Sequence, residues 1–264
     1  MTNIFARFLL VLSFGGFCGL AAEHIATPVA ASADLRPAFE NLGLTLRGQG
    51  SRPTCSVFTV AGALEFAASR KLQRTQRLSV EYLNWASNDV VGKEQDGGFF
   101  SDLWRGFARH GICPEDAMPY ARKFRHSIAP EAAAISAASE TASLGLQLHW
   151  IKEWDVKTGL TPDQMQAIKQ TIASGWPVCG GFRWPKQEQW ENDVLKMCEA
   201  AEVFDGHSIL LVGFKDDASL PGGGAYLVRN SNGAGSESWM PYAYASSFMN
   251  DAVWIDYDAG KKTD

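Results

Sequence analysis

The first half of the chain has the apolar periodicity of helices. Between residues 55 and 71, apolar side chains recur at intervals of three and four residues. This spacing predicts a well-buried helix that begins at or near Cys55. Further helices are expected over 79–88, 101–110 and 161–174.

Two of these segments begin or end at residues that favour helix ends. In the helix that closes the first half, Ser101 is the expected N-cap and Gly111 the C-terminal stop. In the helix of the second half, Thr161 and Gln164 are spaced for a capping box, and Pro162 falls in the first turn. Both segments therefore have defined limits in the sequence itself.

The second half of the chain has the short alternating runs of β-strands. Strands are expected over 144–150, 178–184, 208–214, 225–229 and 252–257. A chain that is helical first and β-rich second favours an α+β architecture of two lobes, with a cleft between them. Residues 34–54 are expected to be irregular because Pro and Gly interrupt them, and 129–143, rich in Ala and Ser, is either a surface helix or an inserted loop.

The N-terminus has the pattern of a secretory signal peptide. Arg7 precedes an apolar run over 8–17, and Ala21 and Ala22 offer a cleavage point, with further small residues up to 33. An uncleaved anchor and a lipoprotein attached through Cys18 are the alternatives. Cleavage is favoured because the chain has no second apolar stretch of spanning length. We therefore expect a secreted or periplasmic protein that meets the membrane only through this signal.

Composition narrows the class of protein. An apolar fraction of 46% with 11% aromatic residues is enough to bury a sizeable core, which excludes a disordered chain. The net charge of −5 and the lack of any long Lys/Arg run argue against a nucleic-acid partner. Four cysteines follow the signal, too few for a disulfide framework, and no CxxC is present; a Cys179–Cys198 disulfide is one possible pairing.

Four residues are suited to acyl transfer. Cys55 lies at a helix start, where the dipole and the N–H groups favour the thiolate. His207 heads an apolar strand and is suited to take a proton and give it to a leaving amine. Asn230, at the end of another strand, would orient the imidazole, and the Gln49 amide with the Cys55 N–H would bind an oxyanion. Taken singly, each residue also fits a structural role, as a buried thiol, a turn residue or a core histidine.

Several segments of the chain occur in the order found in one peptidase family. They are QGSRPTC with Phe58 three places after its Cys, the Gly97-Gly98 pair, GICPEDAMPY, HSILLVGF, YLVRNSNG and WMPYAYASSFMNDAVWID. Together they resemble the papain-like cysteine peptidases over roughly 35–257, the last segment being similar to that of bacterial members. The spacing of six residues from Gln49 to Cys55 is the one the family has between oxyanion-hole Gln and nucleophile.

The resemblance implies a fold, a site and a substrate class. The implied fold is the α+β, two-lobed papain-like one, with nucleophile Cys55, base His207, orienting Asn230 and oxyanion donor Gln49. It also implies a polypeptide substrate whose backbone binds at the glycine pair, with no metal and no cofactor. The residues implied to bind substrate are Gly97, Gly98, Phe99, Gly181 and Gly206. Gly181 and Gly206 suggest room and Phe99 an apolar wall, so an apolar side chain is expected one place before the scissile residue.

The chain also departs from the family pattern. Arg52 replaces a cysteine of the nucleophile segment, so a disulfide of the family is missing, and Ser56 replaces an aromatic residue. Asn232 stands where a tryptophan usually shields the Asn–His hydrogen bond. Trp184, Trp190 and Lys196 are expected in a surface excursion between strands, with a place on the far side of the cleft as the alternative. Because fewer than 50 residues precede Gln49, we expect no long inhibitory propeptide.

The organisation expected from these patterns is a signal peptide over 1–22, a catalytic domain over 34–257 and a polar tail over 258–264. The helical lobe spans about 50–125 and the β-rich lobe about 144–257. The leading hypothesis is a thiol endopeptidase. The alternatives are an idle peptidase-like scaffold that binds a partner, transfer or hydrolysis of a non-protein amide by the same residues, and a metal site formed by Cys113, Cys198 and a His, which no ligand spacing recommends.

Overall fold

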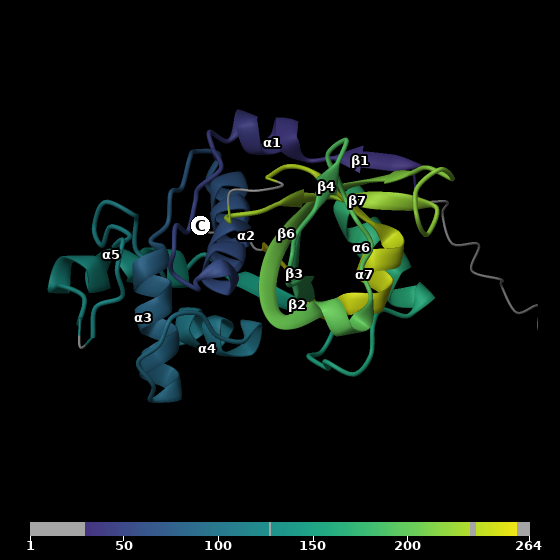
Figure 1. Cartoon of the computed structure of the whole chain (residues 1–264). Coiled ribbons are helices and arrows are strands. Elements are labelled where there is room, and N and C mark those ends of the chain that lie inside the picture. Colours follow the sequence, from purple (N-terminus) through teal and green to yellow (C-terminus); the bar gives the residue numbers. More distant parts are fainter. Residues whose placement is uncertain (1–29, 127, 233–235, 258–264) are drawn as a thin grey trace, which may run out of the picture.

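The computed structural model describes residues 30–126, 128–232 and 236–257. The expected signal peptide and the polar tail lie outside the described residues. A helical part and a β-rich part lie side by side (Figure 1). Helices of the first half lie on one side, and the second half of the chain forms a strongly curved sheet on the other. The predicted α+β arrangement of a helical half followed by a β-rich half is therefore the one observed.

The helical part is organised around one long helix. Its helices are α1 Arg36–Asn41, α2 Cys55–Leu72, α3 Val80–Val91, α4 Phe100–His110 and α5 Ala132–Ala142. Every residue of α2 from Cys55 to Ser69 except Gly62 is buried, because the helix lies between the other helices and the sheet. The prediction of a buried helix beginning at Cys55 is confirmed.

Two features of the helical part differ from the sequence prediction, and a third decides between the two alternatives left open for 129–143. The stretch 34–54, expected to be irregular, contains α1, a short helix that buries Phe39 against Phe66 at 4.5 Å between ring centroids. Helix α4 begins one residue earlier than expected, so that Phe100 is buried; Phe99 is the N-cap, and Ser101 is exposed in the first turn. The Ala-rich stretch 129–143 contains a helix, α5.

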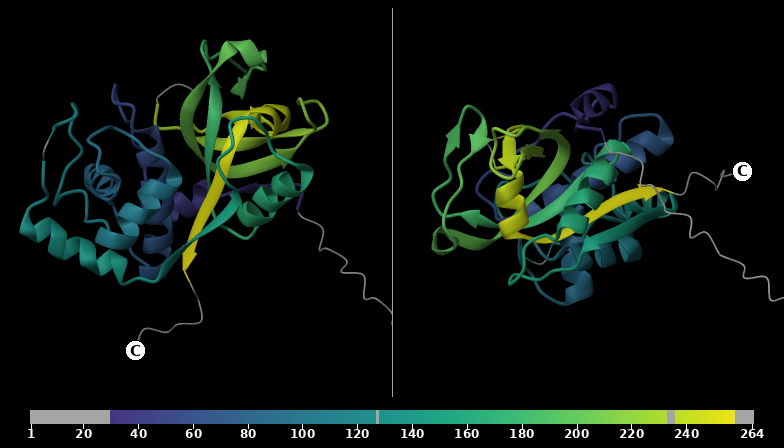
Figure 2. Two further views of the ribbon diagram at one scale, coloured as in Figure 1. Left: turned by 90° about the horizontal axis from the view of Figure 1, so that it is seen from below. Right: turned by 90° about the vertical axis from the view of Figure 1, so that its right-hand side faces the viewer.

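The β-rich part is one mainly antiparallel sheet. Its strands are β1 Ser32–Asp34, β2 Leu146–Lys152, β3 Val178–Pro185, β4 Trp190–Glu191, β5 Val194–Leu195, β6 Val203–Asp216, β7 Gly224–Arg229, β8 Trp239–Pro241 and β9 Met249–Tyr257. The order is β2-β9-β3-β6-β7-β8-β5-β4, and β1 pairs with β6. Helix α2 packs on β6, β9 and β3, while α6 Pro162–Ala173 and α7 Tyr242–Phe248 lie on the far side of the sheet from α2 (Figures 1 and 2).

The strand register brings distant residues of the cleft together. Strand β3 lies between β6 and β9, and Gly181 of β3 is paired with Ser208 on one side and with Asp251 on the other. The next residue of β3, Phe182, is paired with His207. Because directly paired residues share a face of the sheet, Gly181, Ser208 and Asp251 are neighbours on one face.

Several smaller expectations about the β-rich part have clear outcomes. The capping box of Thr161 and Gln164 is present at the start of α6. The suggested Cys179–Cys198 disulfide is wrong: Cys179 is buried in β3 with its thiol directed at Thr59 O, whereas Cys198 is partly exposed outside the sheet core. Strand β8 and helix α7 were not expected. Across the described residues, no helix has the length and apolar character needed to cross a bilayer.

Candidate active site

Cys55 is the first residue of α2 and faces the β-rich part. Its Sγ lies 3.8 Å from the carbonyl oxygen of Gly206, so the thiol is directed across the cleft. Burial raises the pKa of the Cys55 thiol, although hydrogen bonds from the backbone N–H groups of Ser208 and Ser56 act in the opposite direction. The helix start therefore supplies the donors expected from the sequence, but the loss of solvent outweighs them.

His207 and Asn230 form a buried pair beside this thiol. His207 Nε2 lies 3.1 Å from Asn230 Oδ1, and both side chains are buried. The backbone N–H of Asn232 also donates to Asn230 Oδ1, at 3.0 Å. Because an N–H can only donate, this contact identifies the Asn230 atom as the carbonyl oxygen, and His207 Nε2 must then be the donor to it. The other ring nitrogen, Nδ1, is left to accept a proton.

The electrostatics of this pair favour uncharged partners. Burial lowers the pKa of His207 below its ordinary value of 6.5, although the hydrogen bond to Asn230 and the negative charge of Glu188 oppose this. A raised thiol pKa and a lowered imidazole pKa both favour the neutral forms at neutral pH. Burial of both groups therefore opposes the thiolate that the helix dipole alone predicted.

Trp184 covers the imidazole of His207. The two rings are 5.0 Å apart between centroids and inclined by 56°, and Trp184 is buried. Its indole N–H donates to Glu188 Oε2 at 2.6 Å, and the indole N–H of Trp190 donates to Glu188 Oε1 at 3.0 Å. The prediction of a surface excursion is therefore wrong for Trp184, which is buried in β3 against the His207 ring.

Gln49, six residues before Cys55 in the chain, links the two parts of the molecule. Its backbone N–H donates to Ser231 O at 2.9 Å, and the Ser231 hydroxyl donates to Gln49 Oε1 at 2.8 Å. One N–H of its amide donates to Arg52 O at 2.9 Å. The hydroxyl of Tyr120, from the Pro-Tyr segment, donates to Gln49 O. These bonds fix the Gln49 amide, whose second N–H is not used in the bond to Arg52.

A cavity of about 360 Å³ opens directly beside Cys55 and His207. Five of its lining residues were expected from the sequence to bind substrate, namely Gly97, Gly98, Phe99, Gly181 and Gly206. Gln49 and Asn230 do not line this cavity, since they support the site from behind. The structure thus brings together the expected substrate residues with the thiol and the imidazole. Sequence reasoning did not single out several other residues of this lining, among them Trp154, Ser208 and Asp251.

The glycine pair at the edge of this cavity is held by the first turn of α2. Gly97 has φ +76°, and a Cβ there would lie 2.8 Å from Pro53 O, so the position requires glycine. The N–H of Gly98 donates to Ser56 Oγ at 3.1 Å. Ser56, which stands where the family has an aromatic residue, therefore anchors this loop and occupies the N–H of Gly98.

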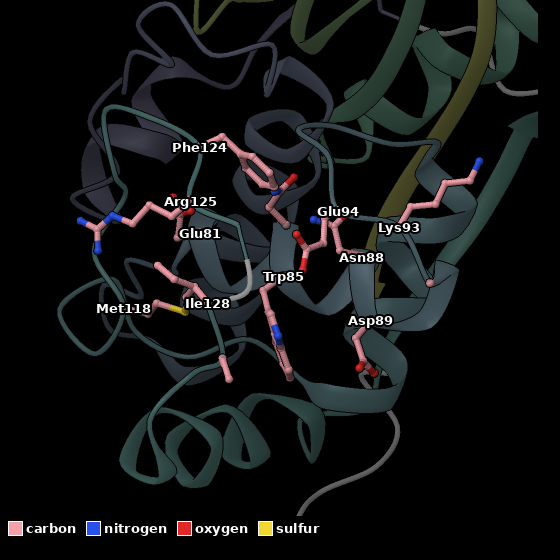
Figure 3. A pocket seen from close by; sticks show the side chains of 13 residues that line it. Glu81, Trp85, Asn88, Asp89, Lys93, Glu94, Met118, Phe124, Arg125 and Ile128 are labelled. Carbon is pink, nitrogen blue, oxygen red and sulfur yellow. The ribbon is translucent and has the colours of Figure 1, made fainter.

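A second, larger cavity of about 440 Å³ lies in the helical part (Figure 3). Figure 3 shows acidic and basic side chains around it, among them Glu81, Asp89, Lys93 and Arg125. Its lining contains no Cys, Ser, Thr or His. Of these two cavities, the one beside Cys55 is lined by both a thiol and an imidazole.

The described residues offer no cluster of three His, Cys, Asp or Glu side chains that could hold a metal ion. The two cysteines of the metal hypothesis are in different parts of the fold. Cys113 is buried beside Tyr82 under α3, and Cys198 lies near the hairpin of β4 and β5. The hypothesis of a metal site formed by both cysteines is therefore wrong.

Comparison with known proteins identifies the fold. No family model matches the chain, and no curated protein matches it. Among solved structures, the chain is similar to xylellain, a cysteine protease from Xylella fastidiosa, with a TM-score of 0.68 and 19% identity over 88% of this chain and 87% of that one. It is also similar to digestive procathepsin L 3 of Tenebrio molitor larval midgut, with a TM-score of 0.60 and 18% identity over 88% and 71%. A third similar structure is the ragweed pollen allergen Amb a 11, a cysteine protease in its proform, with a TM-score of 0.62 and 18% identity over 89% and 69%.

Proposed function

We propose that this chain, which has the fold of papain-like cysteine proteases, is a thiol endopeptidase with Cys55 as nucleophile and His207 as base. One observation carries the proposal: a thiol at the start of α2 and an imidazole supported by Asn230 line the same open cavity. Nucleophile, base and orienting amide are the groups that acyl transfer through a thioester requires.

The proposed reaction begins from the neutral pair. As Cys55 Sγ attacks the scissile carbonyl carbon, its proton passes to His207 Nδ1, the ring nitrogen that Asn230 does not occupy. The carbonyl oxygen becomes an oxyanion, for which the Cys55 N–H and the Gln49 amide are the proposed donors. The C–N bond then breaks, and the amine leaves with the proton from His207. Water, deprotonated by the same imidazole, hydrolyses the thioester and restores the thiol.

Peptide binding in the cleft is proposed to use backbone groups on both sides. The N–H of Gly98 is occupied by Ser56 Oγ, so the Gly98 carbonyl is the group proposed to pair with an extended substrate. Gly206 leaves the opposite wall open, since a Cβ there would meet no atom within 4 Å, whereas the Asp251 carboxylate lies over Gly181. The same geometry favours a polypeptide over a small amide, because an open cavity with backbone contacts suits an extended chain.

The test is hydrolysis together with labelling of Cys55. Wild type should hydrolyse fluorogenic casein, whereas the Cys55→Ala and His207→Ala variants should not. Mass spectrometry should identify Cys55 as the alkylated residue. The rate of Cys55 alkylation at pH 7 should fall at least about tenfold in His207→Ala, because the thiol then has no proton acceptor. A folded wild type that cleaves no peptide, and whose labelling is unaffected by His207→Ala, would overturn the proposal and favour an idle scaffold.

We also propose that the protein acts outside the cytoplasm, after export through its N-terminal signal. The support is the sequence pattern of Arg7 followed by the apolar run over 8–17. N-terminal sequencing of protein recovered from the periplasm or medium of a bacterial expression host should show a new N-terminus. Full-length protein found only in the cytoplasm would contradict this.

A further inference from the structure

Helix α2 begins at a threonine whose side chain does not cap it. Thr54 is the N-cap residue, and threonine is common there because its hydroxyl can accept a hydrogen bond from the second or third N–H of the helix. Within the part of the chain that the structure describes, the Thr54 side chain accepts no such bond. The first N–H groups of α2 are therefore not used by the side chain that usually binds them.

The Thr54 hydroxyl is bonded to Tyr120 instead. Thr54 Oγ1 lies 2.7 Å from the Tyr120 hydroxyl, and that hydroxyl lies 2.9 Å from the carbonyl oxygen of Gln49. A carbonyl oxygen can only accept, so Tyr120 donates its one proton to Gln49, and Thr54 must donate to Tyr120. The contact of Thr54 Oγ1 with Arg52 O is longer, at 3.5 Å. The bond to Tyr120 therefore holds Thr54 in a rotamer that does not cap the helix.

The N–H groups at the start of α2 serve the thiol. Burial raises the pKa of the Cys55 thiol, and the backbone N–H groups of Ser56 and of Cys55 itself are among the hydrogen bonds that oppose this rise. The Cys55 N–H is also a proposed donor to the oxyanion. Ser56 carries the second N–H of the helix, so a Thr54 side chain that capped α2 would compete with the sulfur for it.

The ring of Tyr120 is fixed relative to the start of α2. Its edge-to-face contact with Phe58 of α2 is 5.0 Å between ring centroids, and the Arg52 guanidinium lies 4.7 Å from its centroid. The backbone N–H of Tyr120 donates to Glu115 Oε1 at 2.8 Å. These contacts hold the hydroxyl in place without using it, so its proton and its oxygen remain for Gln49 and Thr54.

The Tyr120 hydroxyl keeps its proton at neutral pH. Burial raises its pKa above the ordinary value of 10, and the charges of Asp96 and Glu81 act in the same direction. The hydrogen bond with Thr54 and the charge of Arg52 oppose this rise without cancelling it. Tyr120 is therefore a hydrogen-bond donor at any pH at which a thiol peptidase would work.

We infer that Tyr120 is a positioning residue of the active site, because its hydroxyl holds the backbone of Gln49 and keeps the Thr54 side chain from capping α2. The inference rests on the proposed peptidase function, in which Gln49 and the start of α2 act on the reacting atoms. Tyr120 does not line the cavity beside Cys55, so it acts only through these two neighbours. One hydroxyl thus supports both the oxyanion donor and the thiol.

The first experiment compares Tyr120→Phe with Tyr82→Phe. Both variants lose a hydroxyl that donates to a backbone carbonyl, but the partner of Tyr82 is His110 O, at the end of α4. Tyr120→Phe should lower kcat for a fluorogenic peptide at least about tenfold and change KM less than about twofold, because the hydroxyl supports groups that act in the transition state. Tyr82→Phe should leave both constants unchanged. Urea midpoints show that the variants are folded, and a wild-type kcat in Tyr120→Phe overturns the inference.

The second experiment tests whether Tyr120 acts through Thr54. In Tyr120→Phe the Thr54 hydroxyl is free to cap α2, so alkylation of Cys55 by iodoacetamide at pH 7, followed by mass spectrometry, should slow at least about threefold. The double variant Tyr120→Phe/Thr54→Val has no competing hydroxyl, so its labelling rate should return to within about twofold of wild type. Its kcat should stay below wild type, because Gln49 O still lacks its hydrogen bond. Thr54→Val alone should be labelled like wild type.

A purely structural role of Tyr120 has a different outcome. If labelling slows in Tyr120→Phe and Thr54→Val does not restore it, the loss does not come from capping of α2, and the inference is overturned.

Failure of the proposed function is distinguishable from failure of this inference, because alkylation of Cys55 requires no hydrolysis. If wild type cleaves no peptide, but labelling slows in Tyr120→Phe and is restored by Thr54→Val, the peptidase proposal fails and the positioning role stands. If wild type cleaves peptides, but neither kcat nor labelling responds to Tyr120→Phe, the inference fails alone.

Discussion

Arg52 and Asp96 form a buried ion pair, with Arg52 Nη2 2.6 Å from Asp96 Oδ1. Arg52 precedes Cys55 by three residues, and Asp96 directly precedes the pair Gly97-Gly98. Arg52 also bonds Glu81 at 2.6 Å and the carbonyl of Ala121 at 2.7 Å. At the position where the resemblance expects a cysteine, this chain thus has an ionic link between the segment before Cys55 and the loop that carries Gly97 and Gly98.

Removal of the Arg52 charge should destabilise the fold strongly. Arg52 is 4% exposed, and Arg52→Met leaves the Glu81 and Asp96 carboxylates buried without their cation. We expect a loss of about 3–5 kcal/mol in the free energy of unfolding, measured by urea denaturation. The matched control is Arg105→Met, which breaks an exposed pair with Asp102 and should change stability by about 0.5 kcal/mol or less. Similar stabilities of the two variants would contradict the structural role of the ion pair.

Loss of the Gln49 amide should slow turnover without unfolding the protein. By comparison with oxyanion donors in general, Gln49→Ala should lower kcat by about 10²–10³. Ser231→Ala removes only the hydroxyl that bonds Gln49 Oε1, so it should cause a smaller loss. The measurement is steady-state hydrolysis of one fluorogenic peptide. A Gln49→Ala variant as fast as wild type would exclude this side chain as an oxyanion donor.

The indole above His207 should affect the rate through the imidazole. Trp184→Phe keeps an aromatic ring but loses the N–H that bonds Glu188. We expect kcat/KM to fall by about tenfold, because water gains access to the His207–Asn230 hydrogen bond and weakens it. Trp150→Phe, an exposed tryptophan on β2, is the control and should be silent. If the two variants have the same kcat/KM, and the ring protons of His207 exchange no faster in Trp184→Phe than in wild type, then Trp184 only fills space.

The charge of Glu188 should tune the titration of His207. Glu188 raises the pKa of His207, so Glu188→Gln should move that pKa further below 6.5. The titration is followed through the His207 ring protons by NMR. Glu191→Gln removes an exposed charge from the adjacent hairpin and is the control. An upward shift in Glu188→Gln would refute the electrostatic link.

Burial of His207 should also make stability depend on pH. Its folded-state pKa lies below the ordinary 6.5, so the unfolded chain binds the proton more readily. The contribution of neutral His207 to the free energy of unfolding is complete above pH 6.5, and it is lost as the pH falls from 6.5 through the folded-state pKa. Urea midpoints should therefore drop more steeply between pH 7 and pH 5 for wild type than for His207→Gln. The variant His126→Gln, altered at an exposed histidine, should keep the wild-type slope.

Local sequence patterns identified the residues whose position depends on their own element. Cys55 was placed by helical periodicity, while His207 and Asn230 were placed by the ends of apolar strands and by the family resemblance. Asp251 could not be recognised in this way, because its position over Gly181 depends on the pairing of β9 with β3 across 70 residues of chain. A lone acid in an apolar strand gives no local signal of that pairing.

The helix α1 and the Trp184 contact were missed for a related reason. A six-residue helix has too few turns to show periodicity, and α1 depends on the packing of Phe39 against Phe66. Trp184 follows a shift of register between β3 and β6, where Phe182 is paired with His207 and Arg183 with Asp205, so that Gly206 of β6 has no partner in β3. Tertiary packing and irregular register decide both features, and neither leaves a pattern in the local sequence.

The hydrogen bonds between Gln49 and Ser231 couple the two walls of the cleft mechanically. Gln49 belongs to the segment that leads into the nucleophile helix, and Ser231 directly follows Asn230. A hinge motion that widens the cleft must either pivot about this clasp or break it. If the clasp breaks, the proposed oxyanion donor Gln49 and the segment that follows Asn230 are displaced together, so we expect an opened molecule to lose the proposed activity in a single step.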